Sequence, residues 1–276
     1  EYKGLAFGQT TLGGRTIKIQ NSVVALIIFA AAAASGQEAN STKAPGDSAP
    51  ALQAEEEYNE AARVAEGHGY IARLTCPGGA PAKFISVGSS VDDKKRFIDT
   101  YQVGCPDGKT ASVVFMPTGP APEPPAGFRL IDKDVWKQFN DVRRSIGTDP
   151  TGALAKANEL IKKWPDVITF VYLRAHIHSA LKMNTEALQD FASAIKVFPN
   201  PSWRLEYLKT VCLHGEISTC IPELTRLKNE LDKKSELLPE VTCWTGVMRH
   251  NNGDKEGMKD IEAACAMGYK YCCKDK

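Results

Sequence analysis

The C-terminal half of this 276-residue chain repeats itself at an interval of about 34 residues. Residues 152–165 (GALAKANELIKKWP) align without gaps on residues 186–199 (EALQDFASAIKVFP), and residues 256–265 (EGMKDIEAAC) align on the start of that segment. A weaker copy, residues 219–228 (TCIPELTRLK), falls between them. An interval of this size, occupied by two amphipathic helices, is typical of a helical-hairpin solenoid, in which each hairpin buries its apolar face against its neighbours. Successive anchor positions of the repeat are 34, 33 and 37 residues apart: Ala153, Ala187, Cys220 and Gly257.

The repeat resembles the tetratricopeptide (TPR) family, whose pattern residues 173–199 fit best. Ala187 stands where helices of that family approach closely, Phe191 stands in the core between helices, and Pro199 ends the second helix. The resemblance covers about residues 130–270 and implies three or four stacked hairpins with a concave surface that binds peptides or proteins. The side chains that it would place in this partner groove are Gln138, Val142, Thr169, Tyr172 and His176.

Most of the eight cysteines lie in the repeat half: Cys212, Cys220, Cys243, Cys265, Cys272 and Cys273. The first two are eight residues apart, a spacing that resembles the Sel1-like relatives of TPR proteins, in which a disulfide staples a helical hairpin. Cys265 and Cys273 have the same spacing. Cys243 and Cys272 would pair if the fourth repeat folds back on the C-terminal tail. An even number of cysteines without a C-x-x-C motif favours disulfides over redox catalysis or haem attachment. The connectivity stays open, and a soft metal at Cys272-Cys273 is the alternative.

Residues 51–116 form a different kind of segment, in which a helix over residues 51–66 precedes short β-prone runs. Two breaks match each other, Cys76-Pro-Gly-Gly and Cys105-Pro-Asp-Gly, and each stands between two expected strands. Either turn resembles half of a zinc knuckle but lacks its second cysteine, so a disulfide between Cys76 and Cys105 is favoured. The resulting thin sheet would have open edges that invite strand pairing. The expected strands are residues 70–75, 83–87, 98–103 and 111–116.

The N-terminal region, residues 1–36, contains basic residues at Arg15 and Lys18, followed by an apolar run over residues 23–34. This order is typical of a secretory signal peptide, and the 12-residue run is shorter than an ordinary membrane span. If the run is retained, it must be buried, either in a membrane through residues 22–35 or against protein. Its β-branched residues favour a strand donated to a neighbour's sheet. The residues of this assembly arm are Ile17, Ile19, Val23, Val24, Leu26, Ile27, Ile28 and Phe29.

Two linkers separate these parts of the chain. Residues 37–50 are rich in small and polar residues, and Asn40 begins an N-x-T sequon that matters only in an exported chain. Residues 117–128 contain five prolines and predict an extended polyproline-II spacer. The sequence therefore predicts an α+β multidomain protein: an N-terminal apolar arm, a small disulfide-linked β unit and, over residues 129–276, a TPR-like α-solenoid.

The net charge and the sequence motifs argue against several classes of function. The 34 basic and 33 acidic residues give a net charge of +1 and form no basic stripe, which argues against nucleic-acid binding. No nucleotide-binding, zinc-protease or serine-hydrolase motif occurs in the sequence. We therefore expect no catalytic site, no metal and no cofactor. The predicted function is that of an exported scaffold subunit with protein partners, located outside the cell, on its surface or in the periplasm. The alternative is a periplasmic or secreted adaptor that captures a client peptide.

Overall fold

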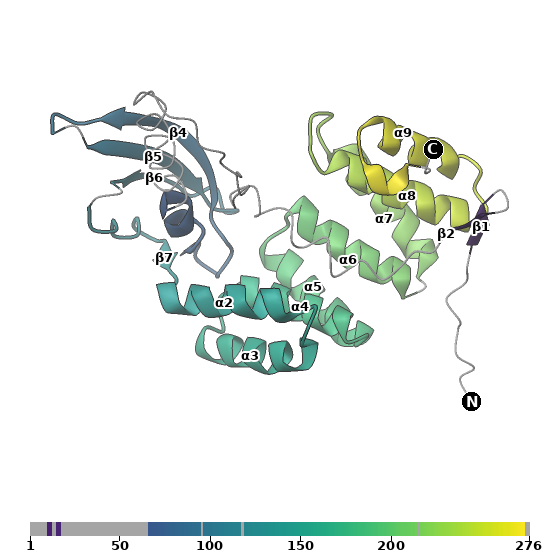
Figure 1. The fold of residues 1–276 in the computed structure, drawn as a ribbon, viewed down its shortest axis with the longest axis horizontal. Helices are drawn as coiled ribbons and strands as arrows, with labels where there is room; N and C mark the ends of the chain where they lie inside the picture. The colour runs from purple at the N-terminus through teal and green to yellow at the C-terminus, as the bar shows by residue number, and fades with distance from the viewer. Residues whose placement is uncertain are drawn as a thin grey trace, which may run out of the picture. The chain divides into compact units, whose positions relative to one another are not determined.

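The computed structural model describes residues 10–12, 15–17, 66–94, 96–116, 119–214 and 216–273. The described residues fall into two compact units, whose boundary lies between Leu173 and Arg174, inside one helix. We call residues 66–173 the N-terminal unit, and residues 174–273 together with residues 10–12 and 15–17 the C-terminal unit. Figure 1 shows the elements of both.

The sheet of the N-terminal unit has three antiparallel strands in the order β4-β5-β6. A bulge interrupts the pairing of β4 with β5 between Ser86 and Gly88. Since side chains alternate across a strand, Tyr101 and Val103 of β5 share the inner, buried face of the sheet. The strands are β4 (Lys83–Val91), β5 (Phe97–Gly104) and β6 (Thr110–Phe115).

Residues 66–71 are helical and cover the inner face of this sheet, where Tyr70 and Ile71 are buried. The prediction of a strand over residues 70–75 was therefore wrong for most of its length. Only β3 (Leu74–Thr75) is a strand, and it pairs with β7 (Arg129–Leu130). The runs predicted at residues 83–87, 98–103 and 111–116 correspond to β4, β5 and β6.

The two Cys-Pro turns have the same backbone geometry. In each, the glycine amide donates to the cysteine carbonyl: Gly79 to Cys76 at 2.9 Å and Gly108 to Cys105 at 3.0 Å. Both glycines have a positive φ, a backbone conformation that residues with a side chain rarely adopt. Gly79 has a second constraint, because a Cβ there would overlap the carbonyl oxygen of Asp166.

Eight helices follow the sheet in four successive hairpins, so the predicted helical repeat is confirmed. Each hairpin has a first and a second helix. The pairs are α2 (Lys133–Ser145) with α3 (Pro150–Lys163), α4 (Ile168–Ala180) with α5 (Asn184–Val197), α6 (Pro201–Leu213) with α7 (Ile217–Glu230), and α8 (Leu238–Asn251) with α9 (Gly257–Ala266). A 3-10 turn, η3 (Lys270–Cys272), follows α9.

Local sequence explains where the helices begin. The side chain of Asp132 accepts hydrogen bonds from the amides of Asp134 and Val135, and thereby caps α2. Asp149 and Asn200 cap α3 and α6 in the same way, and in both helices a proline follows in the first turn.

A close helix contact lies in the fourth hairpin, between α8 and α9. Gly246 of α8 faces Gly257 of α9, and a Cβ on Gly246 would stand 2.7 Å from the carbonyl oxygen of Gly257. The two glycines thus allow helices to approach closely, as the small, fully buried residues Ala153 and Ala187 do in earlier repeats.

Most of the N-terminal arm and the linker with Asn40 lie outside the described residues. The exception in the arm is Ile17, which belongs to β2 (Arg15–Ile17) and pairs with Thr10 of β1 (Thr10–Leu12). Within the described part of the chain, no helix combines the length and the apolar character needed to cross a membrane.

Candidate functional site

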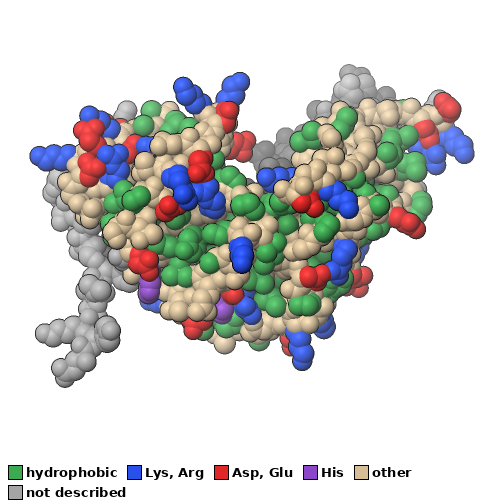
Figure 2. All heavy atoms as spheres, turned by 180° about the vertical axis from the view of Figure 1, so that it is seen from behind, with side chains coloured by type: hydrophobic (Ala, Val, Ile, Leu, Met, Phe, Trp, Pro, Cys, Tyr) green, Lys and Arg blue, Asp and Glu red, His purple; other side chains and the backbone are tan. Residues whose placement is uncertain are grey.

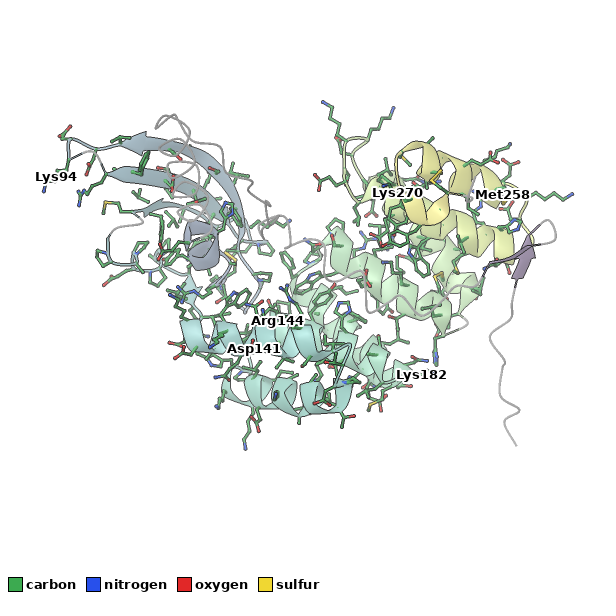
Figure 3. All side chains as sticks on the ribbon, in the orientation of Figure 1. Lys94, Asp141, Arg144, Lys182, Met258 and Lys270 are labelled. Atoms are coloured by element: carbon green, nitrogen blue, oxygen red, sulfur yellow. A yellow bond between two sulfur atoms is a disulfide. The ribbon has the colours of Figure 1, made fainter. Side chains whose placement is uncertain are left out.

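The first helices of the hairpins are the candidate partner-facing elements, and α2 borders a groove. The groove lies between α2 and α3 and has a volume of about 280 Å³. Its lining consists of Gln138, Asp141, Val142, Lys156, Glu159 and Leu160. Val142 and Leu160 are buried at its floor, whereas the other four are polar. Asp141 also forms an ion pair with Arg144 one turn later (Figure 3).

The structure brings together two of the five predicted groove residues, Gln138 and Val142. Thr169 and Tyr172 of α4 are half-buried and are not part of the groove lining. His176 is only 6% exposed and packs edge-on against Phe191, with ring centroids 5.0 Å apart. That burial corrects the expectation for His176, because a partner cannot contact a core side chain.

Burial also controls the protonation of His176. Loss of solvent around the ring lowers its pKa to about 3, and the positive charge of Lys209 contributes in the same direction. The imidazole is therefore neutral at physiological pH and acts as a packing group.

A charged cluster that the sequence analysis missed lies between α6 and α8. The ammonium group of Lys209 donates to Glu206 one turn earlier, at 2.6 Å, and to Glu240 of α8. Its side chain is 6% exposed, and its nitrogen lies 5.5 Å from the ring centroid of Trp244. We call Glu206, Lys209, Glu240, Trp244 and Tyr269 the α6–α8 cluster.

The pKa values of the cluster follow from its burial and charge. Burial alone would lower the pKa of Lys209, but the two carboxylates outweigh it, and the net effect is an increase. Burial raises the pKa of the Tyr269 hydroxyl, and the charge of Glu240 raises it further. Lys209 is thus held as a cation and Tyr269 as a neutral hydrogen-bond donor.

The α6–α8 cluster has a net charge of −1, because two carboxylates surround one ammonium group. The carboxylates retain partial exposure, with side chains 20% exposed for Glu206 and 16% for Glu240. A half-buried indole lies beside them. Carboxylates next to an aromatic ring form a surface suited to a basic side chain of a protein partner.

A second group of buried charges ties the two helices of the second hairpin together. Asp190 of α5 accepts two hydrogen bonds from Arg174 of α4, both at 2.8 Å, and lies 3.2 Å from Nδ1 of His178. These hydrogen bonds raise the pKa of Arg174. These contacts join both helices of the second hairpin.

Both signs of charge are spread over the surface. On the face shown in Figure 2, lysine and arginine side chains are interspersed with aspartate and glutamate side chains. Among the described residues, no group of three or more His, Cys, Asp or Glu side chains could hold a metal ion.

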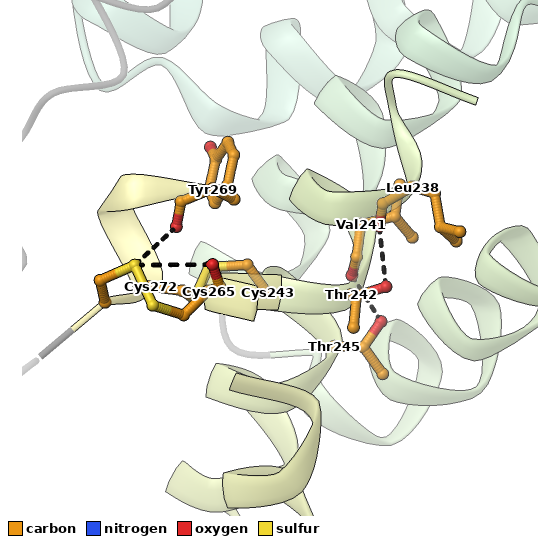
Figure 4. Close-up of a disulfide and its surroundings, with 9 residues drawn as sticks. Leu238, Val241, Thr242, Cys243, Thr245, Cys265, Tyr269 and Cys272 are labelled. Carbon is orange, nitrogen blue, oxygen red and sulfur yellow. Dashed lines mark hydrogen bonds between the residues drawn. A yellow bond between two sulfur atoms is a disulfide. The ribbon is translucent and has the colours of Figure 1, made fainter. Parts of the chain in front are cut away.

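All eight cysteines lie in pairs with Cα–Cα distances in the range of protein disulfides. The distances are 5.7 Å for Cys76–Cys105, 5.2 Å for Cys212–Cys220, 5.9 Å for Cys243–Cys272 and 4.9 Å for Cys265–Cys273. The last two pairs hold η3 against α8 and α9, and Tyr269 of the α6–α8 cluster lies beside them (Figure 4).

No protein-family model and no curated protein sequence matches the chain. Among solved structures, a putative kinesin light chain from Podosopora anserina with nearly identical TPR-like repeats is 12% identical, with a TM-score of 0.43; the match covers 50% of this chain and 76% of that one. The MamA RS-1 ArsTM double mutant is 13% identical over 48% of this chain and 74% of that one, with a TM-score of 0.41. TM-scores below 0.5 do not support a fold assignment, which here rests on the four helical hairpins of the chain itself. The helical half has a TPR-type repeat fold. Nothing about partners follows from these two proteins.

Proposed function

We propose that this TPR-type protein is a non-enzymatic scaffold subunit that assembles with other protein subunits, including copies of itself. The observation that carries the proposal is the partner-facing surface of the first helices, where the α6–α8 cluster presents two carboxylates and an indole. Such a surface is expected to bind the basic side chains of a protein and offers no nucleophile and no general base with a suitably placed substrate pocket.

The cysteine pairs support an exported location. We propose that all four pairs are disulfides in the mature protein, since stable disulfides form in oxidising compartments. Peptide mapping under non-reducing conditions tests the four connections, with Cys76–Cys105 and Cys212–Cys220 as the simplest to isolate. Free thiols at these positions would place the protein in a reducing compartment instead. In an oxidising compartment of a glycosylating cell, Asn40 would be open to modification.

The retained N-terminal arm is the second part of the proposal. Residues 17–29 are expected to contact either a neighbouring subunit, by strand donation, or a membrane through residues 22–35. Mass spectrometry of the purified protein gives the mature N-terminus. A mature chain that starts near Gln37 would exclude the arm from assembly.

Light scattering of the full chain measures assembly directly. The proposal predicts a mass that is a multiple of 30.0 kDa and depends on concentration. A Trp244→Ala variant should weaken the assembly if the α6–α8 cluster contacts a neighbour, whereas the exposed Lys259→Ala variant serves as its control. A mass of one chain at every concentration, with no partner bound, would overturn the proposal.

The groove between α2 and α3 favours a second candidate function. A groove with an apolar floor and polar rim, on a monomeric chain without residues 1–36, is what a secreted adaptor would use to bind a client peptide. A monomer that nevertheless binds a peptide library, and loses this binding when Gln138 is replaced by Arg, would favour the adaptor over the scaffold.

A further inference from the structure

β4 is an exposed edge strand with apolar side chains. All nine of its residues are exposed, including Ile85 and Val87 at 62% each. Among the described strands it pairs on one side only, with β5. An edge strand of this length, with exposed apolar residues, is a site for addition of another strand.

The opposite edge of the same sheet is a poorer acceptor. β6 has six residues against nine in β4, and two of the six, Val113 and Phe115, are buried. Its exposed apolar residue is Val114, at 49%. The sheet therefore has one long, exposed edge.

Residues 20–28 (QNSVVALII) match β4 in an antiparallel register. If Leu26 lies opposite Ile85, then Val24 lies opposite Val87 and Ile27 opposite Phe84. Further along, polar residues meet polar residues, because Ser22 lies opposite Ser89 and Asn21 opposite Ser90. Three apolar pairs thus lie toward one end and two polar pairs toward the other, whereas the terminal pairs, Ile28 with Lys83 and Gln20 with Val91, are mixed.

Charge selects the same orientation. In this register Lys18 lies opposite Asp93, just beyond the end of β4. A parallel arrangement would instead bring Lys18 to the end of the strand occupied by Lys83, and like charges would face each other. Antiparallel addition therefore satisfies both the apolar pattern and the charges.

We propose that β4 accepts residues 20–28 of a second copy of this chain as an antiparallel strand. The inference rests on the proposed function and specifies how two subunits join. The donated segment follows β2, which belongs with the C-terminal unit, whereas β4 belongs to the N-terminal unit.

Site-directed crosslinking between two preparations tests the register. One full-length preparation carries Asn21→Cys and the other carries Ser90→Cys, so a mixed disulfide joins two different chains. Directly opposed residues have Cα atoms about 4.5–5.5 Å apart, within disulfide range. We expect a covalent dimer linked at positions 21 and 90, identified by peptide mapping. Ser112→Cys, on β6, is the matched control and should give no dimer with Asn21→Cys.

Surface variants test the same edge without new cysteines. Ile85→Lys places a charge on the acceptor strand and should weaken subunit association at least tenfold, whereas Val114→Lys, on the same face of β6, should leave it unchanged. If assemblies form normally but the 21–90 link is absent and Ile85→Lys has no effect, the acceptor assignment is refuted while the scaffold function stands. If no assembly forms at all, the proposed function fails as well. A chain that carries both Asn21→Cys and Ser90→Cys gives a further test. If its 21–90 link forms only within single chains, donation between copies is refuted.

Discussion

Replacing Lys209 by Met would test whether the α6–α8 cluster holds two hairpins together. The substitution keeps an apolar stem of similar length but removes the ammonium group that bridges Glu206 of α6 and Glu240 of α8. Two carboxylates, 20% and 16% exposed, would then face each other without a cation. Burying an uncompensated charge costs more than the original pair contributed, because the remaining charge has lost its solvent as well as its partner.

Breaking a buried ion pair from one side costs about 3–5 kcal/mol, and the partial exposure of the carboxylates places Lys209→Met near about 3 kcal/mol. With a urea dependence of about 2–3 kcal/mol/M, the unfolding midpoint should fall by about 1 M. Circular dichroism follows the transition. Hydrogen exchange should show the loss of protection in α6 and α8.

The pH dependence gives a second readout of the same variant. In the unsubstituted protein the raised pKa of Lys209 means that its contribution is complete below 10.5 and is lost only as the pH rises through the higher, folded value. The difference in stability between the two proteins should therefore be fully present below pH 10.5 and shrink as the pH rises above it, through the folded pKa of Lys209.

Two controls make the experiment decisive. Lys259→Met removes an exposed ion pair with Glu256 and should not change the midpoint. Combining Lys209→Met with Gln at positions 206 and 240 removes all three charges and should restore most of the stability. An unchanged midpoint for Lys209→Met, or a combined variant as unstable as the single one, would refute the reasoning.

Three further predictions concern other parts of the C-terminal unit. Gly246→Ala should lower the free energy of unfolding by about 1–3 kcal/mol, because its Cβ meets the carbonyl oxygen of Gly257; urea denaturation measures this. His176→Phe should flatten the acid limb of the stability profile, since burial and Lys209 lower the histidine pKa from 6.5 to about 3 and stability is therefore lost as the pH falls through this range, by at most about 1.4 kcal/mol per pH unit. Replacing Cys243 and its partner by Ser opens a loop of 29 residues and should cost about 3–4 kcal/mol, measured by thermal and urea unfolding.

The helical repeat was accessible from the sequence because its signal is local and recurs. Phe198 ends α5 through a hydrogen bond to the carbonyl of Ala194, and Trp164 ends α3 in the same way through Leu160. These two pairs of positions are 34 residues apart. A regular interval of apolar residues, small residues and terminal prolines is enough to locate such hairpins.

The helix at residues 66–71 could not be recognised from local preference. Tyr70 and Ile71 favour strands when considered alone, and Gly67 and Gly69 argue against a helix. In the fold, however, Gly67 lies so close to the hydroxyl of Tyr101 that a Cβ would approach it to 2.6 Å. Tertiary packing of the helix on the sheet outweighs local propensity.

The α6–α8 cluster was missed for a related reason. Lys209 and Glu240 are 31 residues apart, and nothing in the sequence marks one lysine of many as buried. The only local signal was the spacing of Glu206 and Lys209, three residues apart, which is typical of ordinary ion pairs on helix surfaces. The same limit applies to His176, since its burial depends on Phe191 from the facing helix.

The cysteines explain how the less regular repeats keep the TPR-type fold. The buried small residue of the repeat is Ala153 in the first hairpin and Ala187 in the second, but Cys220 in the third, and all three are fully buried. Cys220 fills the close-packed position and faces Cys212 of the preceding helix, so one residue provides both the packing and the connection. By the loop-entropy relation, closing an eight-residue loop contributes about 2–3 kcal/mol, comparable to the packing that a divergent hairpin loses.

The fourth hairpin extends the same principle. Its anchor position is Gly257, which contributes no side chain to the core, and its second helix has ten residues against 14 in α5. Two cysteine pairs connect this hairpin to η3 and the residue after it: Cys243–Cys272 and Cys265–Cys273. Cross-links are therefore concentrated where the sequence departs most from the repeat of the first two hairpins. It follows that reduction should loosen α6 to α9 while α2 to α5, which contain no cysteine, keep their helices.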